Sequence, residues 1–348
     1  MKIKVLFLFA IALGFISCEN QENTVADFGS TAVFFPYQTP ARTIVQGEYD
    51  LGFNDNDNKG RFEIGVVMSG VFENQVDRKV YFEYAPELID TLAMADVDTI
   101  NVQLLPQSYY TIEQQSPVTI PAGSVQGRIP VQLSDAFFDD PLSFADFGDV
   151  HYVLPLKITN VEGIDSILSG MPLADNPIKV RETDWNPVPK DYTLFGIKFM
   201  NKYQGKYLRR GADVMTNASG DVTTSTYRSE YVEKDELTTL TTTGRSDVSY
   251  SNRIRRGDLS SPGDVNIQLI FTSDDTCVVS SAEGDLNLVS GSGKFVQDGD
   301  EWGGEKRDVI HLDYTYTDAV NNETHAVKDT LVLRNRDVKF DQFTLSFN

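Results

Sequence analysis

Hydrophobic and polar residues alternate along much of the second half of the chain. In residues 265–271 an apolar side chain falls at every second position, with Asn266 and Gln268 between them. Residues 310–316 repeat this pattern, and residues 343–347 end the chain in the same way. Because successive side chains of a strand point to opposite faces, a period of two predicts half-buried strands. Strands of this kind that continue to the C-terminus predict an antiparallel barrel with an apolar interior.

The first half of the chain contains shorter strand-like segments, which are rich in β-branched and aromatic residues and are bounded by Gly, Pro, Asn or Asp. These segments are 33–35, 62–67, 80–84, 118–120, 129–133 and 153–158. Short strands separated by turn residues predict a β-sandwich. Pro130 and Pro155 interrupt two of the segments and predict edge strands or bulges there. Residues 86–94 and 134–140 are predicted to form short helical turns, the second with Ser134 and Asp135 as its N-terminal capping residues.

Two domains are expected, because 348 residues exceed the size of most single cores. The predicted division is a signal peptide over residues 1–17, an acidic tether over 18–30, a β-sandwich over 31–182, a Pro-rich linker over 183–191 and a β-barrel over 192–348. The linker is placed where Pro187 and Pro189 stiffen the chain, as prolines between domains often do.

The N-terminal residues have the pattern of an export signal. Lys2 and Lys4 precede an apolar run over residues 5–15, and Cys18 follows shortly after. A charged start, an apolar core of about 7–15 residues and a cleavage point are typical of a secretory signal, and the run is well short of the ~20 residues of a membrane-spanning helix. A cysteine at the cleavage point resembles a bacterial lipobox, with Phe15 where leucine is commonest. The resemblance implies that Cys18 receives a diacylglycerol. The alternative is a plain cleaved signal with Cys18 as an ordinary thiol.

The charge balance restricts the partners. The chain has 30 Lys and Arg against 51 Asp and Glu, a net charge of −21. A surface this negative repels phosphate backbones and anionic head groups. Nucleic acid is therefore not expected as a partner, whereas neutral sugars, cations and basic peptides remain open.

The chain has two cysteines, Cys18 and Cys277. If Cys18 is acylated, no intramolecular disulfide can form, and the exported protein depends on packing alone. Cys277 lies in an apolar run without a nearby basic residue that would lower its pKa, so it is predicted to be a buried and unreactive thiol.

Motifs for catalysis and for metal binding are missing from the sequence. A Gly-x-Ser-x-Gly elbow does not occur, and the Gly-rich residues 290–294 do not complete a phosphate-binding loop and are predicted to form a turn. His151, His311 and His325 are too widely separated for a zinc motif and are predicted to be isolated surface or core histidines. The expectation is a protein that is not an enzyme, without cofactor or metal. Paired carboxylates from separate strands stay open, because acidic residues are abundant.

One acidic loop, residues 54–60, alternates oxygen-bearing side chains before a glycine. Lys59 breaks the calcium-loop pattern, and Val66 stands where that pattern requires glutamate. The loop is predicted to be a solvated hairpin tip, and whether Asp55 and Asp57 bind calcium is left open.

A sugar site needs an exposed aromatic ring beside amides and carboxylates. Residues 298–304 have this composition, with Trp302 on a glycine-flanked polar loop. The predicted ligand-binding residues are therefore Trp302, Asp300 and Glu301. The alternative is that Trp302 folds back against the end of the barrel. Trp185 is predicted to pack between the domains.

Several sequence blocks resemble a known family. Residues 105–110, 118–124 and 152–158, in this order and spacing, resemble an N-terminal β-sandwich family of unknown function. That family occurs on surface lipoproteins encoded beside starch-utilisation-system-type glycan importers. Residues 201–211 and 329–334 resemble the lipocalin-like domain that often follows it. The implied fold class is all-β, an N-terminal Ig-like β-sandwich followed by a lipocalin-like antiparallel β-barrel.

Together, the resemblance and the residues predict a non-catalytic lipoprotein that is anchored in the outer membrane through Cys18 and exposed at the cell surface. It would capture oligosaccharide or polysaccharide for an importer complex. One alternative is an adhesin or assembly subunit that binds another protein through edge strands. Another is a lipocalin-like carrier of a small apolar ligand, against which bulky aromatic residues inside the barrel would argue.

The anchor can be tested at one residue. Replacing Cys18→Ala should release the protein from the membrane fraction and abolish its contribution to cell-surface binding while both domains stay folded, because only the attachment point for lipid is lost. Membrane fractionation and circular dichroism measure the two effects. The matched control, Cys277→Ala, removes the other cysteine and should leave the protein in the membrane fraction. A Cys18→Ala protein that stays with the membrane would contradict lipid anchoring.

Overall fold

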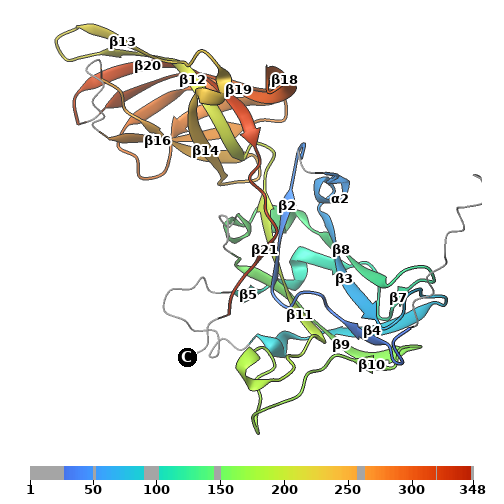
Figure 1. Cartoon of the computed structure of the whole chain (residues 1–348). Coiled ribbons are helices and arrows are strands. Elements are labelled where there is room, and N and C mark those ends of the chain that lie inside the picture. Colours follow the sequence, from blue (N-terminus) through green and yellow to red (C-terminus); the bar gives the residue numbers. More distant parts are fainter. Residues whose placement is uncertain are drawn as a thin grey trace, which may run out of the picture.

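A computed structural model describes residues 27–49, 52–89, 102–144, 150–256, 263–318 and 320–345. The predicted signal peptide, Cys18 and most of the tether lie outside the described residues. The strands form a β-sandwich and a closed β-barrel (Figure 1), which confirms the all-β class. Among the described residues, no helix has the length and apolar character needed to cross a membrane.

The sandwich encloses one apolar core between two sheets. The first sheet has the order β10 (Ser166–Ile167), β1 (Ala32–Phe34), β3 (Arg61–Ser69), β8 (Gln126–Leu133) and β6 (Tyr110–Ile112). The second has the order β21 (Asp341–Gln342), β2 (Pro40–Val45), β11 (Tyr192–Met200), β9 (Tyr152–Glu162), β4 (Arg78–Tyr84) and β7 (Val118–Ile120), with β5 (Gln103–Leu104) paired to β9. In β3, Phe62, Ile64, Val66 and Met68 are buried, and the residues between them are partly exposed. Because burial alternates from one residue to the next, one face of the strand points toward the core.

The helices among the described residues are short. They are α2 (Asp55–Asn58), α3 (Asp135–Phe138) and the 3-10 turns η1 (Pro86–Leu88), η2 (Gln107–Tyr109), η3 (Pro141–Ser143), η4 (Glu182–Asp184) and η5 (Val232–Lys234). The predicted helical turn at 134–140 is confirmed by α3, but the hydroxyl of Ser134 donates to the carbonyl of Ser108 (2.9 Å) instead of capping the helix. The predicted turn at 86–94 begins as η1, and residues 90–94 lie outside the described residues.

Pro130 and Pro155 were predicted to lie on edge strands or at bulges. Neither of them lies on an edge strand. Strand β8 lies between β3 and β6, and β9 lies between β11 and β4. The carbonyl of Pro130 accepts from the N–H of Glu113 (3.0 Å), just beyond the end of β6, and that of Pro155 accepts from Ala85 (3.1 Å), just beyond β4. In an antiparallel strand the N–H and C=O of one residue point to the same side, and a proline has no N–H. At both prolines that side faces the position where the neighbouring strand has just ended, so no hydrogen bond within the paired strands is lost.

The domain boundary differs from the predicted one. Strand β11, predicted to begin the barrel, pairs in parallel with β2 and antiparallel with β9 in the sandwich. The predicted linker 183–191 also lies along the sandwich, where the N–H of Phe35 donates to the carbonyl of Lys190 (2.8 Å). The chain therefore crosses to the barrel after Met200, near Asn201. Prolines stiffen a chain equally when it runs along a sheet, so they did not mark the crossing.

The last strand was also assigned to the wrong domain. Strand β21 pairs with β2 of the sandwich, and Phe343 packs with Val150 and Leu194 in a sandwich cluster. Phe347, the last apolar position of the predicted strand, lies outside the described residues. A period of two predicts one buried face but does not identify what that face is buried against.

The barrel strands are β12 (Gly205–Thr216), β14 (Glu236–Thr242), β15 (Asp247–Arg253), β16 (Asp264–Phe271), β17 (Thr276–Ser281), β18 (Leu288–Trp302), β19 (Glu305–Asp318) and β20 (Glu323–Asn335). Pairing of β20 with β12 closes the barrel, and β13 (Val222–Tyr227) lies outside the ring on β12. The predicted inward faces of 265–271 and 310–316 are confirmed. Tyr207, Tyr314 and Tyr316 are buried inside, so bulky rings fill the barrel, which argues against the apolar-carrier alternative.

Two glycines of β18 make room for large side chains of β19. Gly291 pairs with Tyr314, and a Cβ on Gly291 would lie 2.4 Å from the Cβ of Tyr314. A Cβ on Gly293 would lie 2.5 Å from a methyl carbon of Leu312. The Gly-rich residues 290–294 are therefore part of strand β18, and the prediction that they form a turn is wrong. The glycines are required because large side chains of β19 occupy the space in front of them.

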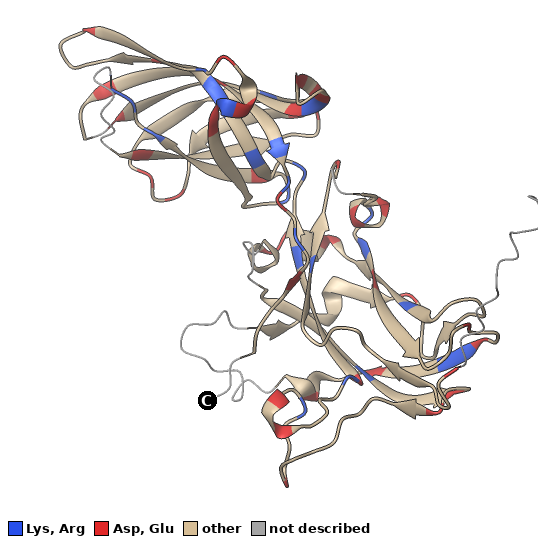
Figure 2. Cartoon of the chain, viewed as in Figure 1, with Lys and Arg blue, Asp and Glu red and all other residues tan. Residues whose placement is uncertain are grey.

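Acidic residues are spread over both domains, many of them in loops and near strand ends (Figure 2). The acidic residues behind the net charge of −21 are therefore not confined to one domain.

The junction between the domains is fixed by a buried arginine. Arg336 follows β20, and its side chain is almost fully buried. Its guanidinium donates to the carbonyls of Asn201 (2.5 Å), Lys202 (2.6 Å) and Gln46 (3.1 Å). The Arg336 side chain thus connects three segments: the chain that enters the barrel at residues 201–202, the chain that leaves the barrel after β20, and the end of β2.

Replacing Arg336→Met should destabilise the protein by about 3 kcal/mol, because an unsatisfied buried acceptor costs about 1–3 kcal/mol and three carbonyls lose a charged donor. Denaturant unfolding measures the loss. The control is Arg334→Met, which changes an exposed arginine two residues earlier and should alter stability by less than about 0.5 kcal/mol. Equal stabilities of the two variants would contradict the role of Arg336.

The Cys277 side chain is buried, as predicted. Burial raises the pKa of this thiol to about 12. In a Cys18→Ala protein at pH 8, Cys277 should therefore resist a disulfide reagent in the native state and react only after unfolding, which absorbance assays measure.

The control moves the thiol by one position, by combining Cys277→Ala with Val278→Cys. Val278 is 55% exposed on the outer face of β17, so the new thiol should react in the native protein. Rapid native labelling of Cys277 would show that its burial is incomplete.

Candidate functional site

The domain junction contains a hollow of about 540 Å³. It lies where the segment after β2 faces strands β18 and β19 of the barrel. Its principal side chains are Glu48, Tyr49, Phe53, Asn54 and Asp55 from the sandwich, and Lys202, Asp275, Phe295, Gln297 and Asp308 from the chain entering the barrel and from the barrel.

The sandwich wall of this hollow is held by the acidic segment that resembled a calcium loop. Asp57 is buried and accepts from the Arg42 guanidinium (2.6 Å) and from the N–H of Val45 (3.0 Å). The amide of Asn54 donates to the carbonyls of Val45 and Gly47, both at 2.8 Å. Burial raises the pKa of Asp57, and the Arg42 charge opposes that rise. The segment shapes the turn at residues 45–47.

This arrangement changes the interpretation of the acidic loop. The predicted hairpin tip is instead the short helix α2. Both carboxylate oxygens of Asp57 are occupied by protein donors, whereas Asp55 is exposed at the hollow. The alternating oxygen-bearing side chains therefore have a structural use, which their spacing did not reveal.

The two domains approach each other closely at Gly47. Its φ is +84°, and a Cβ there would lie 2.5 Å from the Cβ of Lys202, so only glycine fits without displacement. The Lys202 ammonium pairs with Asp275 and lies 5.0 Å from the ring centre of Tyr203. Hydrogen bonds from Lys202 and Tyr203 lower the pKa of Asp275, although its partial burial opposes them. The barrel side of the hollow therefore contains the Lys202–Asp275 ion pair, which lies against the aromatic ring of Tyr203.

The hollow combines an aromatic ring with polar groups. Phe53 is fully exposed at its rim. Gln297 donates its amide to the carboxylate of Glu48 across the junction, and the carboxylate of Asp55 is exposed beside them. An exposed ring next to amide and carboxylate groups suits a sugar, whose C–H face stacks on the ring while its hydroxyls bond to the polar atoms.

Three carboxylates approach one another at the edge of this hollow. In the described part of the chain, Glu48, Asp298 and Asp308 form the one acidic group whose ligand atoms lie within 4.8 Å of each other. Glu48 already accepts from Gln297, and Asp308 accepts from the N–H of Asp298 (3.0 Å). Burial raises the pKa of Asp308. Protein donors thus reach two of the three carboxylates, and the cluster does not by itself define a metal site.

The predicted sugar residues lie elsewhere, at the end of β18. The Trp302 indole N–H donates to the carbonyl of Leu333 (3.2 Å), and the Arg307 guanidinium lies 4.8 Å from the ring centre. The carboxylate of Asp300 accepts from the N–H of Glu301 (2.8 Å), and Glu301 is exposed. Trp302 thus folds back onto the barrel wall with a guanidinium over its ring. The ligand role of these residues stays a prediction.

Trp185 does not pack between the domains as predicted. Its indole N–H donates to the carbonyl of Ile178 (2.9 Å), and the Lys179 ammonium lies 4.9 Å from its ring centre. These contacts belong to the sandwich, because the chain around residue 185 does not cross the junction.

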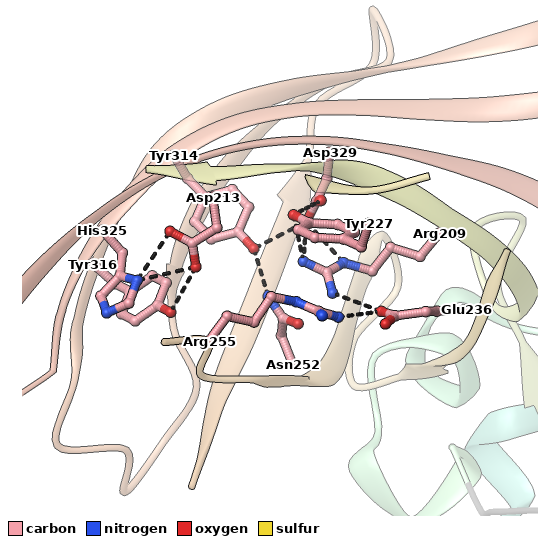
Figure 3. A network of polar contacts seen from close by, with 10 residues as sticks. All are labelled: Arg209, Asp213, Tyr227, Glu236, Asn252, Arg255, Tyr314, Tyr316, His325 and Asp329. Atoms are coloured by element: carbon pink, nitrogen blue, oxygen red, sulfur yellow. Dashed lines mark hydrogen bonds and ion pairs between the residues drawn. The ribbon is translucent and has the colours of Figure 1, made fainter. Parts of the chain in front are cut away.

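The barrel contains a buried polar network that the sequence analysis missed (Figure 3). The carboxylate of Asp329 accepts from the guanidinium of Arg209 (2.9 and 3.0 Å) and from the hydroxyls of Tyr227 and Tyr314, the latter at 3.0 Å. The hydroxyl of Tyr314 in turn accepts from the amide of Asn252 (2.9 Å). Burial lowers the pKa of Arg209, but the nearby Asp329 carboxylate outweighs it and raises that pKa, so Arg209 stays charged.

A second buried pair extends the network. His325 is fully buried, and its Nδ1 lies 2.9 Å from a carboxylate oxygen of Asp213. The rings of His325 and Tyr316 stack with centres 4.3 Å apart. His325 is therefore a core histidine with a partner, whereas His311 is exposed and His151 is partly buried.

A glycine makes the network possible. Gly211 pairs with Asp329 across β12 and β20. A Cβ on Gly211 would lie 2.6 Å from a carboxylate oxygen of Asp329 and 2.2 Å from the carbonyl oxygen of Lys328. The glycine leaves the space that the Asp329 carboxylate needs to meet Arg209, and a buried charge is tolerable only when it is paired in this way.

Sequence comparisons define the class of protein. Residues 28–165 match a family of N-terminal domains, and residues 202–337 match DUF5627, a domain of unknown function. The second range begins where the chain enters the barrel. The protein is therefore of a two-domain class in which this N-terminal domain precedes a DUF5627 barrel. No curated protein matches the chain.

Solved structures identify the family. The chain is 34% identical to a protein of unknown function from Bacteroides ovatus, with a TM-score of 0.84, over 93% of this chain and 100% of that one. It belongs to the family of that Bacteroides ovatus protein.

More distant similarities were also found. A multidomain protein including DUF1735 from Bacteroides ovatus has 14% identity and a TM-score of 0.42, over 88% of this chain and 96% of that one. An auxiliary nutrient binding protein from Bacteroides thetaiotaomicron VPI-5482 has 13% identity and a TM-score of 0.40, over 84% and 90%. Similarities this low carry no conclusion about the present chain.

Proposed function

We propose that this protein is a non-catalytic, lipid-anchored surface protein that captures oligosaccharide or polysaccharide in the hollow at its domain junction. The observation that carries the proposal is the fully exposed Phe53 beside the carboxylates and amides of that hollow. Bound glycan would be passed to an importer in the outer membrane.

The contacts available in the hollow suit a neutral sugar. A phenyl ring offers stacking but no hydrogen bond, so selectivity would come from the polar groups around it. Glu48, Asp55 and Asp308 supply acceptors, and Gln297 and Lys202 supply donors. This acceptor-rich lining favours hydroxyl groups, which donate, and disfavours anionic ligands.

Weak contacts suffice if the protein is tethered. The proposed lipid on Cys18 would hold every copy at the membrane surface, where neighbouring copies share one polymer. Linked binding sites raise the effective concentration, so the avidity exceeds the affinity of a single hollow. The rings that fill the barrel support a capture site outside its interior.

Replacing Phe53→Ala should weaken polysaccharide binding about tenfold, because a ring stack contributes about 0.5–1.5 kcal/mol beyond its buried area. Affinity gel electrophoresis with a panel of plant and host polysaccharides measures the retardation.

The matched control is Phe72→Ala, which removes another exposed phenylalanine (71%) that does not line the hollow. That variant should bind as the unchanged protein does. If the unchanged protein is retarded by no polysaccharide of the panel, or if both variants lose binding equally, the assignment to the junction is wrong.

A further inference from the structure

The barrel is open at one end between two of its strands. Strands β14 and β15 are paired through Thr241–Ser249 and Thr242–Val248. Beyond these pairs, β14 continues along β12 and β15 continues along β16. The two strands diverge, and a hollow of about 400 Å³ lies in the gap.

The lining of this barrel hollow is unusual for a chain with a net charge of −21. It includes the three arginines Arg209, Arg253 and Arg255, against the two carboxylates Glu236 and Asp264. Asp329 pairs with Arg209 from behind the lining, so the charges around this hollow balance, whereas the protein as a whole is strongly negative. The hollow therefore opposes an anionic group less than the rest of the surface does.

Two of the arginines are held in place by the network of Figure 3. The Arg209 guanidinium is fixed by Asp329 and lies 4.3 Å from the ring centre of Tyr227. The Arg255 guanidinium lies 4.2 Å from the same ring centre. Stacking on one ring orients both planar groups before any ligand arrives, which reduces the entropy lost on binding.

The same hollow contains polar atoms without partners. Asn252 is only 4% exposed, and within the described structure its side-chain oxygen accepts no hydrogen bond. The buried Nε of Arg255 likewise has no acceptor among the described residues. Unsatisfied buried polar groups destabilise the free protein, so a ligand that supplies a donor to Asn252 and an acceptor to Arg255 would recover the free energy of those missing hydrogen bonds.

Glu236 occupies the position that an incoming carboxylate would take. Its carboxylate pairs with Arg255 and lies 3.5 Å from Arg209. The Glu236 side chain is 46% exposed, so it can turn to solvent when a ligand carboxylate takes its place on Arg255, while Arg209 keeps its pair with Asp329. It acts as an internal competitor for the two arginines.

We propose that the barrel hollow binds a small hydroxylated carboxylate of the sugar-acid class, with its carboxylate on Arg209 and Arg255 and a hydroxyl donating to Asn252. This site is separate from the junction hollow and does not rest on the function proposed for it.

Calorimetric titration with glucuronate, glucose and acetate tests the ligand class. Glucuronate should bind at least about tenfold more tightly than either control, because glucose lacks the carboxylate and acetate lacks the hydroxyls. Glucuronate binding no tighter than that of glucose or acetate would overturn the proposal.

Three variants of the full chain test the site. Replacing Arg255→Gln should weaken glucuronate about tenfold, and Arg255→Lys should weaken it less, because lysine keeps the charge but not the planar fork. Replacing Glu236→Gln should strengthen binding, because the competing charge is gone. A loss of affinity in Glu236→Gln, or unchanged affinity in both Arg255 variants, would contradict the site.

Two controls separate this site from other effects. Arg128→Gln removes an exposed arginine that pairs with Glu63 on the sandwich, so it changes the net charge equally. It should leave glucuronate binding unchanged, and an equal loss would indicate a bulk charge effect and overturn the proposal. Phe53→Ala should also keep glucuronate binding even where it loses polysaccharide binding. The two proposed sites are thus tested independently, because a negative result for one of them leaves the result for the other readable.

Discussion

The relative position of the two domains depends on the guanidinium of Arg336. The chain crosses between the domains twice, near residue 201 and again after β20, and Arg336 bonds to carbonyls at the first crossing and at the end of β2. A buried arginine is stable only when its donors are satisfied, so these carbonyls and the guanidinium require each other. The exposed pair of Arg245 and Asp135 also joins the domains, but an exposed ion pair contributes about 0–1 kcal/mol.

The shape of the junction hollow follows from this constraint. Arg336 holds Gln46 against the turn that carries Lys202, and the adjacent Gly47 is the residue that tolerates the resulting approach. The walls of the hollow are then set by the side chains of α2 on one side and by the Lys202–Asp275 pair on the other. A hollow with walls fixed in the free protein loses little entropy on binding, which suits the capture of a flexible polymer.

The sequence predicted the strands well where one face is apolar and the other polar. Period-two alternation located β16 and β19 and identified their inward residues. It did not predict partners, and β11 and β21 were therefore placed in the barrel although both pair within the sandwich. Sequence spacing contains no information about which sheet a strand joins when both domains are built from similar strands.

The polar network was missed for a related reason. Asp329 lies at an inward position of β20, between the buried Val327 and Leu331, so the alternation did contain the signal of an interior charge. The sequence analysis did not single out Asp329 among the 51 acidic residues of the chain. The decisive clue, an inward glycine facing an inward aspartate, appears only when β12 and β20 are paired in register.

The two hollows show why net charge alone is a poor guide to ligands. The junction hollow is lined mainly by acceptors and suits the hydroxyls of neutral sugars, whereas the barrel hollow concentrates arginines. The arginines of the barrel are retained at little cost because Asp329 and Tyr227 already satisfy Arg209, and the ring of Tyr227 orients Arg255. A buried network that stabilises the barrel therefore also presents oriented cations at its open end. Structure and binding would share the same residues, so a change at Asp329 would alter both, whereas a change at the exposed Glu236 would alter binding alone.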